Sequence, residues 1–400
     1  MADIPPREQL VSLRKIFASR QNEFLASVRA LVEIESPSGD IAGSREVVSL
    51  LSQIAGQVPA VGSIDRIPAP DFGEHLRIRA FGRDNNPPPI LLLGHTDTVL
   101  PRGSLAARPW RADENRIYGP GVFDMKSNCA LAIEILRLLD ANETKPAAPI
   151  TLLLTCDEES GSPSGRALVE AEARHARAVL VLEPSASGGR AKTARKGTGM
   201  FTIEVKGRAA HAGLDPEKGV NAVLELARQS VRLSELNDPA NGTNVTVTMF
   251  SGGTASNVVP AIATAEVDMR FTSLDLGVAV ESDIQSLQPF DSRAQLRVIG
   301  GINRPPLERT QKVGALYERA RAIAALLDFD LGEASVGGGS DGNFAAALGV
   351  PVLDGLGIEG DGAHADHEHI LTDNIATRAA MLAGLIASLR VSSSEFFEFY

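Results

Sequence analysis

The sequence has few of the residues that would support a disulfide framework, a membrane span or a nucleic-acid interface. Only two of its 400 residues are cysteine, Cys129 and Cys156, so we expect both to be buried and unpaired in a reducing compartment. No apolar stretch approaches the roughly 20 residues that a bilayer span needs. The 39 basic residues are outnumbered by 50 acidic ones, which argues against a nucleic-acid partner. We therefore expect neither a membrane nor a nucleic acid as partner.

The N-terminal residues, MADIPPREQLVSLRKIF, contain no uninterrupted apolar run after a basic start, so we expect no secretory signal and a cytoplasmic protein. The composition is that of a soluble globular protein, with 44% hydrophobic and 22% charged residues. A chain of 400 residues is too long for one ordinary core, so two domains are expected.

Three short apolar runs, residues 90–93, 150–154 and 178–182, predict strands of a parallel sheet. Each run is nearly continuous rather than alternating, which is typical of strands buried on both faces. Amphipathic segments over residues 129–141 and 164–176 follow the first two runs and predict helices. This β–α rhythm predicts an α/β domain with a mostly parallel sheet flanked by helices.

The apolar pattern changes near residue 198, where hydrophobic and polar positions begin to alternate. Alternation predicts antiparallel strands with one covered face, here over residues 198–209, 244–253, 261–272 and 294–301. Two helical segments lie between them and predict the cover. We therefore expect an inserted α+β domain over residues 198–307, and a discontinuous first domain built from residues 1–197 and 308–400.

Each buried strand of the first domain is followed by side chains that can bind a metal ion. His95 and Asp97 follow the first run, Glu158 and Glu159 the second, and Glu183 the third. The carboxyl ends of strands in an open α/β sheet line one crevice, so these side chains should converge. Taken singly, each pattern also fits a polar turn or a solvated acidic loop. Adjacent carboxylates point in different directions, so one can bind metal while the other acts as a base.

Two further candidates lie in loops. Asp124 lies in YGPGVFDMKSN just before a helix, a position where an acid also serves as a helix cap. His364 lies in the Gly-rich loop GDGAHADHEHI beside His367 and His369, and its selection depends on the spacing to Glu368. A mixed histidine and carboxylate set suits zinc, with manganese or cobalt as substitutes.

In their order along the chain, these motifs resemble the M20 family of co-catalytic zinc peptidases, and within it the glutamate carboxypeptidase-like branch. The matching stretches are GHTDTV, YGPGVFDMK, TCDEESGS, LEPS, GRAAHAG, GGTASNVVP, DMRF, GGGSDG and GAHADHE. The resemblance implies a zinc exopeptidase-like catalytic domain with an inserted ferredoxin-like lid and dimerisation domain. It also implies a cis peptide bond between Asp124 and Met125.

The resemblance further implies two Zn²⁺ ions per chain, with Mn²⁺ or Co²⁺ as substitutes. His95 and Glu183 look like ligands of one ion. Glu159 and His364 look like ligands of the other. Asp124 looks like the carboxylate that bridges the two ions.

The catalytic roles are implied in the same way. Glu158 looks like the general base, and Asp97 looks like the residue that orients His95. His211, in GRAAHAG, looks like the residue that stabilises the oxyanion from the partner subunit. This role implies a homodimer that forms through the inserted domain.

The substrate side of the site is implied by four motifs. Asn257 and Arg270 match the contacts to a substrate carboxylate, which a guanidinium binds in a bidentate manner. Gly339 and Ser340, in GGGSDG, would present backbone N–H groups near the same carboxylate, and Ser340 stands where the branch usually has Thr. Arg304 would reach an acidic side chain, as in the glutamate-releasing branch.

These residues predict a hydrolase that cleaves an amide or peptide bond next to a C-terminal amino acid with a free carboxylate. A metal-bridging water would be the nucleophile. The enzyme would be a carboxypeptidase acting on a small-molecule or peptide substrate, with glutamate as the expected product. An N-acyl-amino-acid deacylase or a dipeptidase of the same family stays open as an alternative. A metal-free binding or regulatory protein on the same fold is a more remote alternative, because the ligand set and Glu158 are intact.

Overall fold

The computed structural model describes residues 4–82, 87–141 and 145–389, which form two compact units. The first unit comprises Met1–Ala194, Arg309–Val336 and Ser340–Tyr400. The second comprises Arg195–Glu308 and Gly337–Gly339. Residues 1–3 and 390–400, at the ends of the predicted first domain, lie outside the described residues.

A six-stranded sheet of order β1-β2-β6-β3-β7-β14 forms the centre of the first unit. Four of its strands are mutually parallel: β6 (Ile150–Thr155), β3 (Ile90–His95), β7 (Ala178–Val181) and β14 (Val352–Leu353). The hairpin of β1 (Val61–Ala69) and β2 (Gly73–Ala80) completes one edge and pairs antiparallel with β6. Every residue of β3, β6 and β7 is buried, which confirms the mostly parallel sheet predicted from the apolar runs.

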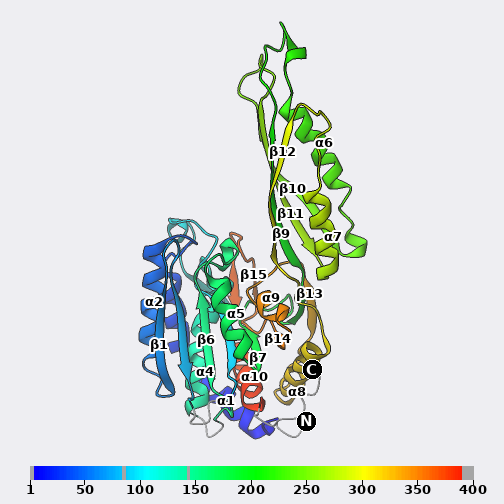
Figure 1. The fold of residues 1–400 in the computed structure, drawn as a ribbon. Helices are drawn as coiled ribbons and strands as arrows, with labels where there is room; N and C mark the ends of the chain where they lie inside the picture. Colours follow the sequence, from blue (N-terminus) through cyan, green and yellow to red (C-terminus); the bar gives the residue numbers. More distant parts are fainter. Residues whose placement is uncertain (1–3, 83–86, 142–144, 390–400) are drawn as a thin grey trace. The chain divides into compact units, whose positions relative to one another are not determined.

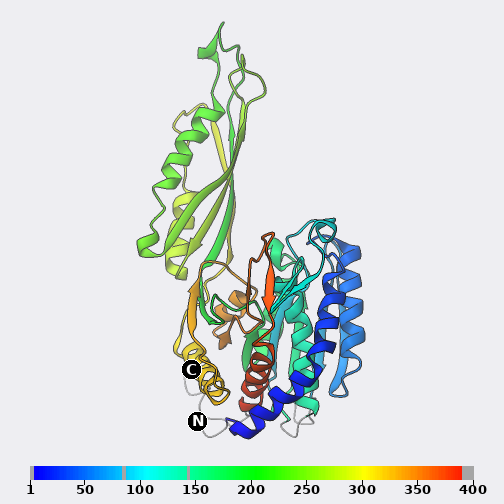
Figure 2. The same cartoon turned by 180° about the vertical axis from the view of Figure 1, so that it is seen from behind.

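Helices cover both faces of this sheet (Figures 1 and 2). On one face, α1 (Arg7–Val32) contacts α4 (Ser127–Ala141) and α10 (Ile375–Ser388), and α2 (Ile41–Ala55) contacts α4 and β2. On the other, α5 (Gly165–His175) contacts β6 and α9 (Gly342–Ala347). Helix α8 (Gln311–Leu326) contacts α10 and β14. One continuous apolar cluster joins α1, α2, α4, α8 and α10 to the sheet.

Two smaller pairings shape the loops of the first unit. An antiparallel sheet of order β15-β16-β5-β4 is formed by Gly360–Asp361, His369–Leu371, Arg116–Tyr118 and Arg111–Asp113. Strand β8 (Ala191–Arg195) pairs with β13 (Glu333–Val336), and α3 (Ser104–Ala107) is a single turn. The small sheet matters for the site because β16 immediately follows the loop that carries His364.

The second unit has the β-α-β-β-α-β order of a ferredoxin-like fold. Its elements are β9 (Gly197–Lys206), α6 (Ala222–Ser234), β10 (Thr243–Gly252), β11 (Ile262–Phe271), α7 (Leu274–Gln285) and β12 (Gln295–Arg304). The strands form one antiparallel sheet of order β10-β11-β9-β12. Both helices pack on it and enclose a separate apolar core around Phe201, Met269 and Phe271. This arrangement confirms the predicted α+β fold with its two covering helices.

Two expectations from the sequence concern the cysteines and membrane-spanning helices. Cys129 and Cys156 are both buried and unpaired. Across the described ranges, every helix is too short or too polar to traverse a bilayer.

Candidate metal centre

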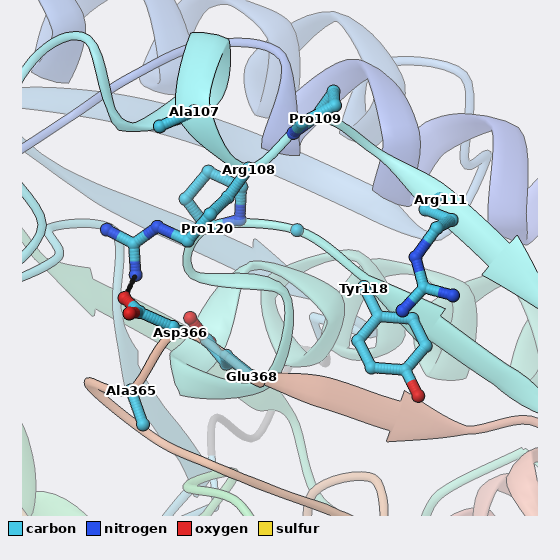
Figure 3. A pocket seen from close by; sticks show the side chains of 10 residues that line it. Ala107, Arg108, Pro109, Arg111, Tyr118, Pro120, Ala365, Asp366 and Glu368 are labelled. Atoms are coloured by element: carbon cyan, nitrogen blue, oxygen red, sulfur yellow. Dashed lines mark ion pairs between the residues drawn. The ribbon is translucent and has the colours of Figure 1, made fainter.

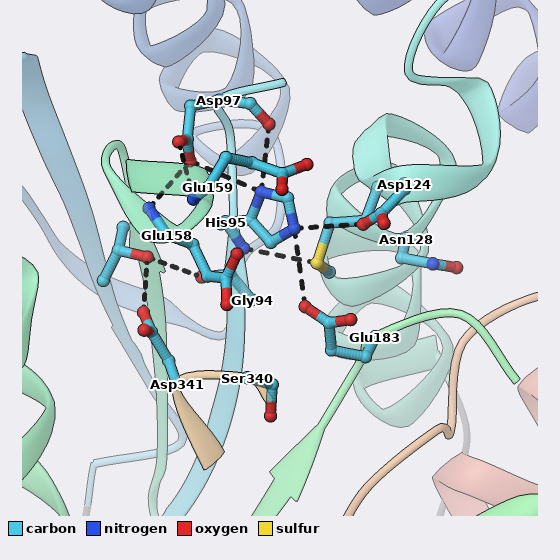
Figure 4. A network of polar contacts seen from close by, with 12 residues as sticks. Gly94, His95, Asp97, Asp124, Asn128, Glu158, Glu159, Glu183, Ser340 and Asp341 are labelled. Atoms are coloured by element: carbon cyan, nitrogen blue, oxygen red, sulfur yellow. Dashed lines mark hydrogen bonds and ion pairs between the residues drawn. The ribbon is translucent and has the colours of Figure 1, made fainter. Parts of the chain in front are cut away.

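The carboxyl ends of three parallel strands bring the predicted ligands together (Figure 4). His95 is the last residue of β3, and Glu183 follows β7. Glu158 and Glu159 open a single 3-10 turn, Glu158–Ser160, just after β6. Asp124 comes from a distorted turn, Val122–Lys126, that leads into α4, and the Asp124–Met125 peptide bond is cis as expected.

Asp124 lies between the two histidines and faces each of them with a different oxygen. Its Oδ1 is 3.1 Å from His95 Nε2, and its Oδ2 is 3.4 Å from His364 Nε2. Glu183 Oε1 lies 3.4 Å from His95 Nε2. Glu159 Oε1 lies 3.2 Å from His364 Nε2. The donors thus form two groups, each with one histidine and one glutamate, that share Asp124.

The spacing of these donor atoms fits two bound cations. Two ligands of a tetrahedral zinc ion, each about 2.1 Å from the metal, lie about 3.4 Å from one another. The four distances between a histidine Nε2 and a carboxylate oxygen in these two groups, 3.1 to 3.4 Å, match that separation. Donor atoms of His95, Asp124 and Glu159 also lie within 4.8 Å of one another, as do those of His95, Glu158 and Glu183. Imidazole and carboxylate donors in this ratio are those that zinc prefers.

Asp97 fixes the orientation of His95 and also holds the turn that carries the two glutamates. His95 Nδ1 lies 3.0 Å from the Asp97 carbonyl oxygen and 3.4 Å from its carboxylate, so Nδ1 carries the hydrogen. Nε2 is then the nitrogen that would bind a cation. The carboxylate of Asp97 accepts hydrogen bonds from the backbone N–H groups of Glu158, at 3.2 Å, and Glu159, at 3.1 Å. The Ser38 hydroxyl donates to the same carboxylate at 2.5 Å.

The crowding of carboxylates raises the pKa of both histidines. Burial lowers the pKa of His95, but its hydrogen bonds to Asp124, Asp97 and Glu183 outweigh this and hold it well above its ordinary value. Hydrogen bonds to Asp124 and Glu159 raise the pKa of His364 to about 10. Burial raises the pKa of Glu159. Both imidazoles therefore bind protons in the metal-free protein, at the positions where a cation would bind.

A buried network behind the glutamate turn was missed in the sequence. His75, on β2, accepts a hydrogen bond at Nδ1 from the Cys156 backbone N–H at 3.2 Å, so its Nε2 donates to the Ser164 hydroxyl at 3.0 Å. Ser164 in turn donates to Asp157 at 2.6 Å. This chain of hydrogen bonds braces both ends of the loop that carries Glu158. The only sign of this network in the sequence is a histidine within a strand. That pattern is too common to predict a hydrogen-bonded network.

The second unit holds the predicted oxyanion residue. His211 is exposed and accepts hydrogen bonds at Nδ1 from the backbone N–H groups of Gly213, at 3.1 Å, and Leu214, at 3.2 Å. Its Nε2 therefore carries the hydrogen and is a donor, as an oxyanion contact requires. Asn257 is exposed, and its backbone carbonyl oxygen accepts a hydrogen bond from the Ala212 N–H at 2.9 Å.

Two arginines that are predicted to contact the substrate also contact other groups of the protein. Arg270 Nε and Nη2 donate to the Asp268 carboxylate at 2.8 and 2.7 Å. Arg304 is buried, and its side chain closely approaches the backbone of Gly339.

Ser340, in the first unit, is fully buried. Its hydroxyl donates to Asp354 at 2.7 Å, and its N–H donates to the Asn343 side chain at 3.0 Å. These hydrogen bonds hold the loop around Ser340. The substrate roles of Asn257, Arg270, Arg304, Gly339 and Ser340 stay predictions.

Comparison with known proteins settles the family. A model described as Peptidase family M20/M25/M40 matches residues 91–388. The chain belongs to this family. It is 31% identical to carboxypeptidase G2 of Pseudomonas sp. over 376 residues, covering 92% of this chain and 90% of the relative. It is 28% identical to a succinyl-diaminopimelate desuccinylase of Roseobacter denitrificans over 338 residues, covering 76% and 84%.

The fold is likewise that of the family. A crystal structure from Bacillus subtilis, described as a dinuclear metal binding peptidase from the M20 family, matches with a TM-score of 0.64 at 15% identity. The match covers 92% of this chain and 98% of that one. The protein is therefore an M20 metallopeptidase, in the broad sense of a metal-dependent amide hydrolase.

The raised histidine pKa values make metal binding depend on pH. His364, with a pKa of about 10, is protonated at pH 7, so a cation must displace its proton. We expect calorimetric titration of Zn²⁺ into the metal-free protein to show proton release, and the affinity to rise as the pH rises toward that pKa. His364→Asn should release about one proton fewer, because the displaced imidazolium is gone. His367→Asn, on the same loop, serves as the control, and equal release by the two variants would contradict this reading.

Proposed function

We propose that the protein is a di-zinc hydrolase that removes a C-terminal amino acid, glutamate in the first instance, from an acyl or peptidyl group. The single observation that carries the proposal is the position of Asp124, with one carboxylate oxygen toward His95 and the other toward His364. A shared carboxylate between two histidine–glutamate pairs supports a site for two ions. Two Zn²⁺ ions exceed the charge of the three ligand carboxylates by one, and would acidify a water and polarise the scissile carbonyl.

Glu158 supports a hydrolytic reaction because its carboxylate lies close to His95 and Glu183 but is not one of the two glutamates, Glu159 and Glu183, that pair with a histidine around Asp124. Its carboxylate lies within 4.8 Å of donor atoms of His95 and Glu183. Asp97 holds its backbone, so the side chain projects from a fixed turn. In this position Glu158 takes a proton from the attacking water and returns it to the leaving amine, whose departure requires protonation.

The choice of substrate rests on the second unit. Arg270 offers a guanidinium for a free carboxylate, and its contact with Asp268 holds that guanidinium in place. His211, with its hydrogen on Nε2, supports the oxyanion that forms on the scissile carbonyl. The relative named a carboxypeptidase favours release of an amino acid from a peptide-like bond. The relative named a desuccinylase favours N-acyl-amino-acid deacylation as the second candidate.

A paired substrate screen tests this proposal. The zinc-loaded enzyme should hydrolyse N-acyl amino acids, folyl-type glutamates or dipeptides with a free carboxylate, and lose activity on the matching C-terminal amides. Glu158→Gln should lower kcat by about 10²- to 10⁴-fold and retain both ions, because it removes only the proton carrier. The adjacent Glu159→Gln is the matched control and should lose metal content.

Three results would overturn the proposal. One is wild-type protein that binds no metal and hydrolyses none of these substrates. Another is unchanged turnover in Glu158→Gln. A third is equal hydrolysis of acids and amides, which would remove the free carboxylate from recognition.

The homodimer is also proposed to form through the second unit. Strand β10 lies at the edge of its sheet, and its Met249 and Phe250 are 68% and 46% exposed. On α6, Leu224 and Val231 are 52% and 61% exposed. An edge strand with exposed apolar residues beside an apolar helix face is a surface that pairing with a second copy would cover.

Complementation tests whether His211 acts across that dimer. Neither His211→Ala nor Glu158→Gln should be active alone, but a mixed dimer of the two has one site with Glu158 in one chain and His211 in the other. Random exchange should then restore about a quarter of the wild-type activity, because half the dimers have one working site of two. Glu158→Gln mixed with the double variant is the control, since none of its sites has Glu158. No recovery, with mixed dimers verified by mass spectrometry, would exclude a His211 role from the partner.

A further inference from the structure

Glu368 is a buried carboxylate that the proposed reaction does not use. It is 4% exposed and lies at the wall of a small cavity of about 240 Å³ that is also lined by Arg108 and Tyr118 (Figure 3). An ionised carboxylate is costly to bury unless hydrogen bonds replace the lost water. Glu368 therefore needs hydrogen-bond donors from the protein to replace that water.

Those donors are three backbone N–H groups of the loop that presents Asp124. Glu368 Oε2 accepts from Gly121 at 2.8 Å. Its Oε1 accepts from Phe123 at 2.9 Å and from Asp124 itself at 3.0 Å. A carboxylate that accepts from three converging N–H groups restricts the backbone that supplies them. The contact thus fixes the backbone of the bridging residue rather than its side chain.

Glu368 also belongs to the loop that carries His364. The two residues are four positions apart, and the segment between them is a tight turn in which Ala365 N–H donates to Gly362 at 2.8 Å and Glu368 N–H donates to Ala365 at 3.2 Å. Directly after Glu368 the chain enters β16, which pairs with β5 and is thereby fixed to the unit. One side chain therefore ties the loop of His364 to the loop of Asp124.

We propose that Glu368 is a positioning residue that sets Asp124 between the two histidines, and so couples the two metal sites. The inference rests on the proposed di-metal function. Asp124 must present one oxygen to each site, and a shift of its backbone would change both N–O distances together. Removing the Glu368 anchor should therefore weaken both sites at once, although Glu368 is not one of the five proposed ligands.

The test compares two isosteric substitutions at buried carboxylates. Glu368→Gln keeps the shape of the side chain, but its NH2 group must face an N–H donor. Glu225→Gln is the matched control, because Glu225 in the second unit is 2% exposed and accepts backbone N–H bonds from Phe290 at 2.9 Å and Asp291 at 3.1 Å. Both variants lose the same kind of contact, but only Glu368 accepts from the loop that presents Asp124.

Two readouts are expected to separate the variants. Hydrogen–deuterium exchange at residues 121–124 of the metal-free protein should be about tenfold faster in Glu368→Gln and unchanged in Glu225→Gln. Co²⁺ should bind Glu368→Gln about 10- to 100-fold more weakly at both sites, with an altered visible absorption spectrum and a lower kcat at nearly constant KM. Should Glu368→Gln fail to fold by circular dichroism, Glu368→Asp, with the charge retained and the reach shortened, is expected to show the same pattern.

The outcomes also separate this inference from the proposed function. Unchanged exchange at residues 121–124 and an unchanged Co²⁺ spectrum in a folded Glu368 variant would overturn the positioning role, even with two ions bound to the wild type. Weakening of only one of the two sites would overturn the coupling. Wild-type protein without affinity for metal would instead defeat the proposed function, whatever the exchange experiment shows.

Discussion

The structure of the first unit depends on the electrostatic cost of gathering carboxylates in one crevice. Asp97, Asp124, Glu158, Glu159 and Glu183 all lie around His95, and like charges this close repel one another unless positive charge or hydrogen donors offset them. Backbone N–H groups neutralise one part of this charge, as at Asp97. Protons on the histidines offset another part, which is why their pKa values rise. Two cations would offset the rest and would also supply the chemistry of hydrolysis.

The fold holds these groups in place by making their attachment points rigid. His95 ends one strand, and Glu158, Glu159 and Glu183 follow two others. All three strands are buried along their whole length, so the sheet fixes where each side chain begins. Asp124 and His364 come from loops instead, and each loop is tied back by hydrogen bonds, of which those to Glu368 link the two. Rigid strands and tied loops together preorganise the site, as binding of a cation at a fixed geometry requires.

The sequence was sufficient to predict the parallel strands, the alternating strands of the second unit and the residues that converge. Continuous apolar runs identify β3, β6 and β7 because burial on both faces leaves few polar positions. The β1–β2 hairpin was not predicted, because β1 is an edge strand whose apolar residues are interrupted by charges such as Asp65 and Arg66. His75 was missed with it. The sequence marks Glu368 only by its spacing to His364, because its hydrogen-bond partners are backbone groups that any sequence would supply.

The central claim is that Asp124 bridges two cations between the histidines. Crystallographic anomalous scattering at the zinc absorption edge, on protein purified with Zn²⁺, tests it most directly. The account predicts two anomalous peaks about 3.5–4 Å apart, with one oxygen of Asp124 bound to each. His95 and Glu183 should contact one peak, and Glu159 and His364 the other. A single peak, or two peaks without Asp124 between them, would contradict the account.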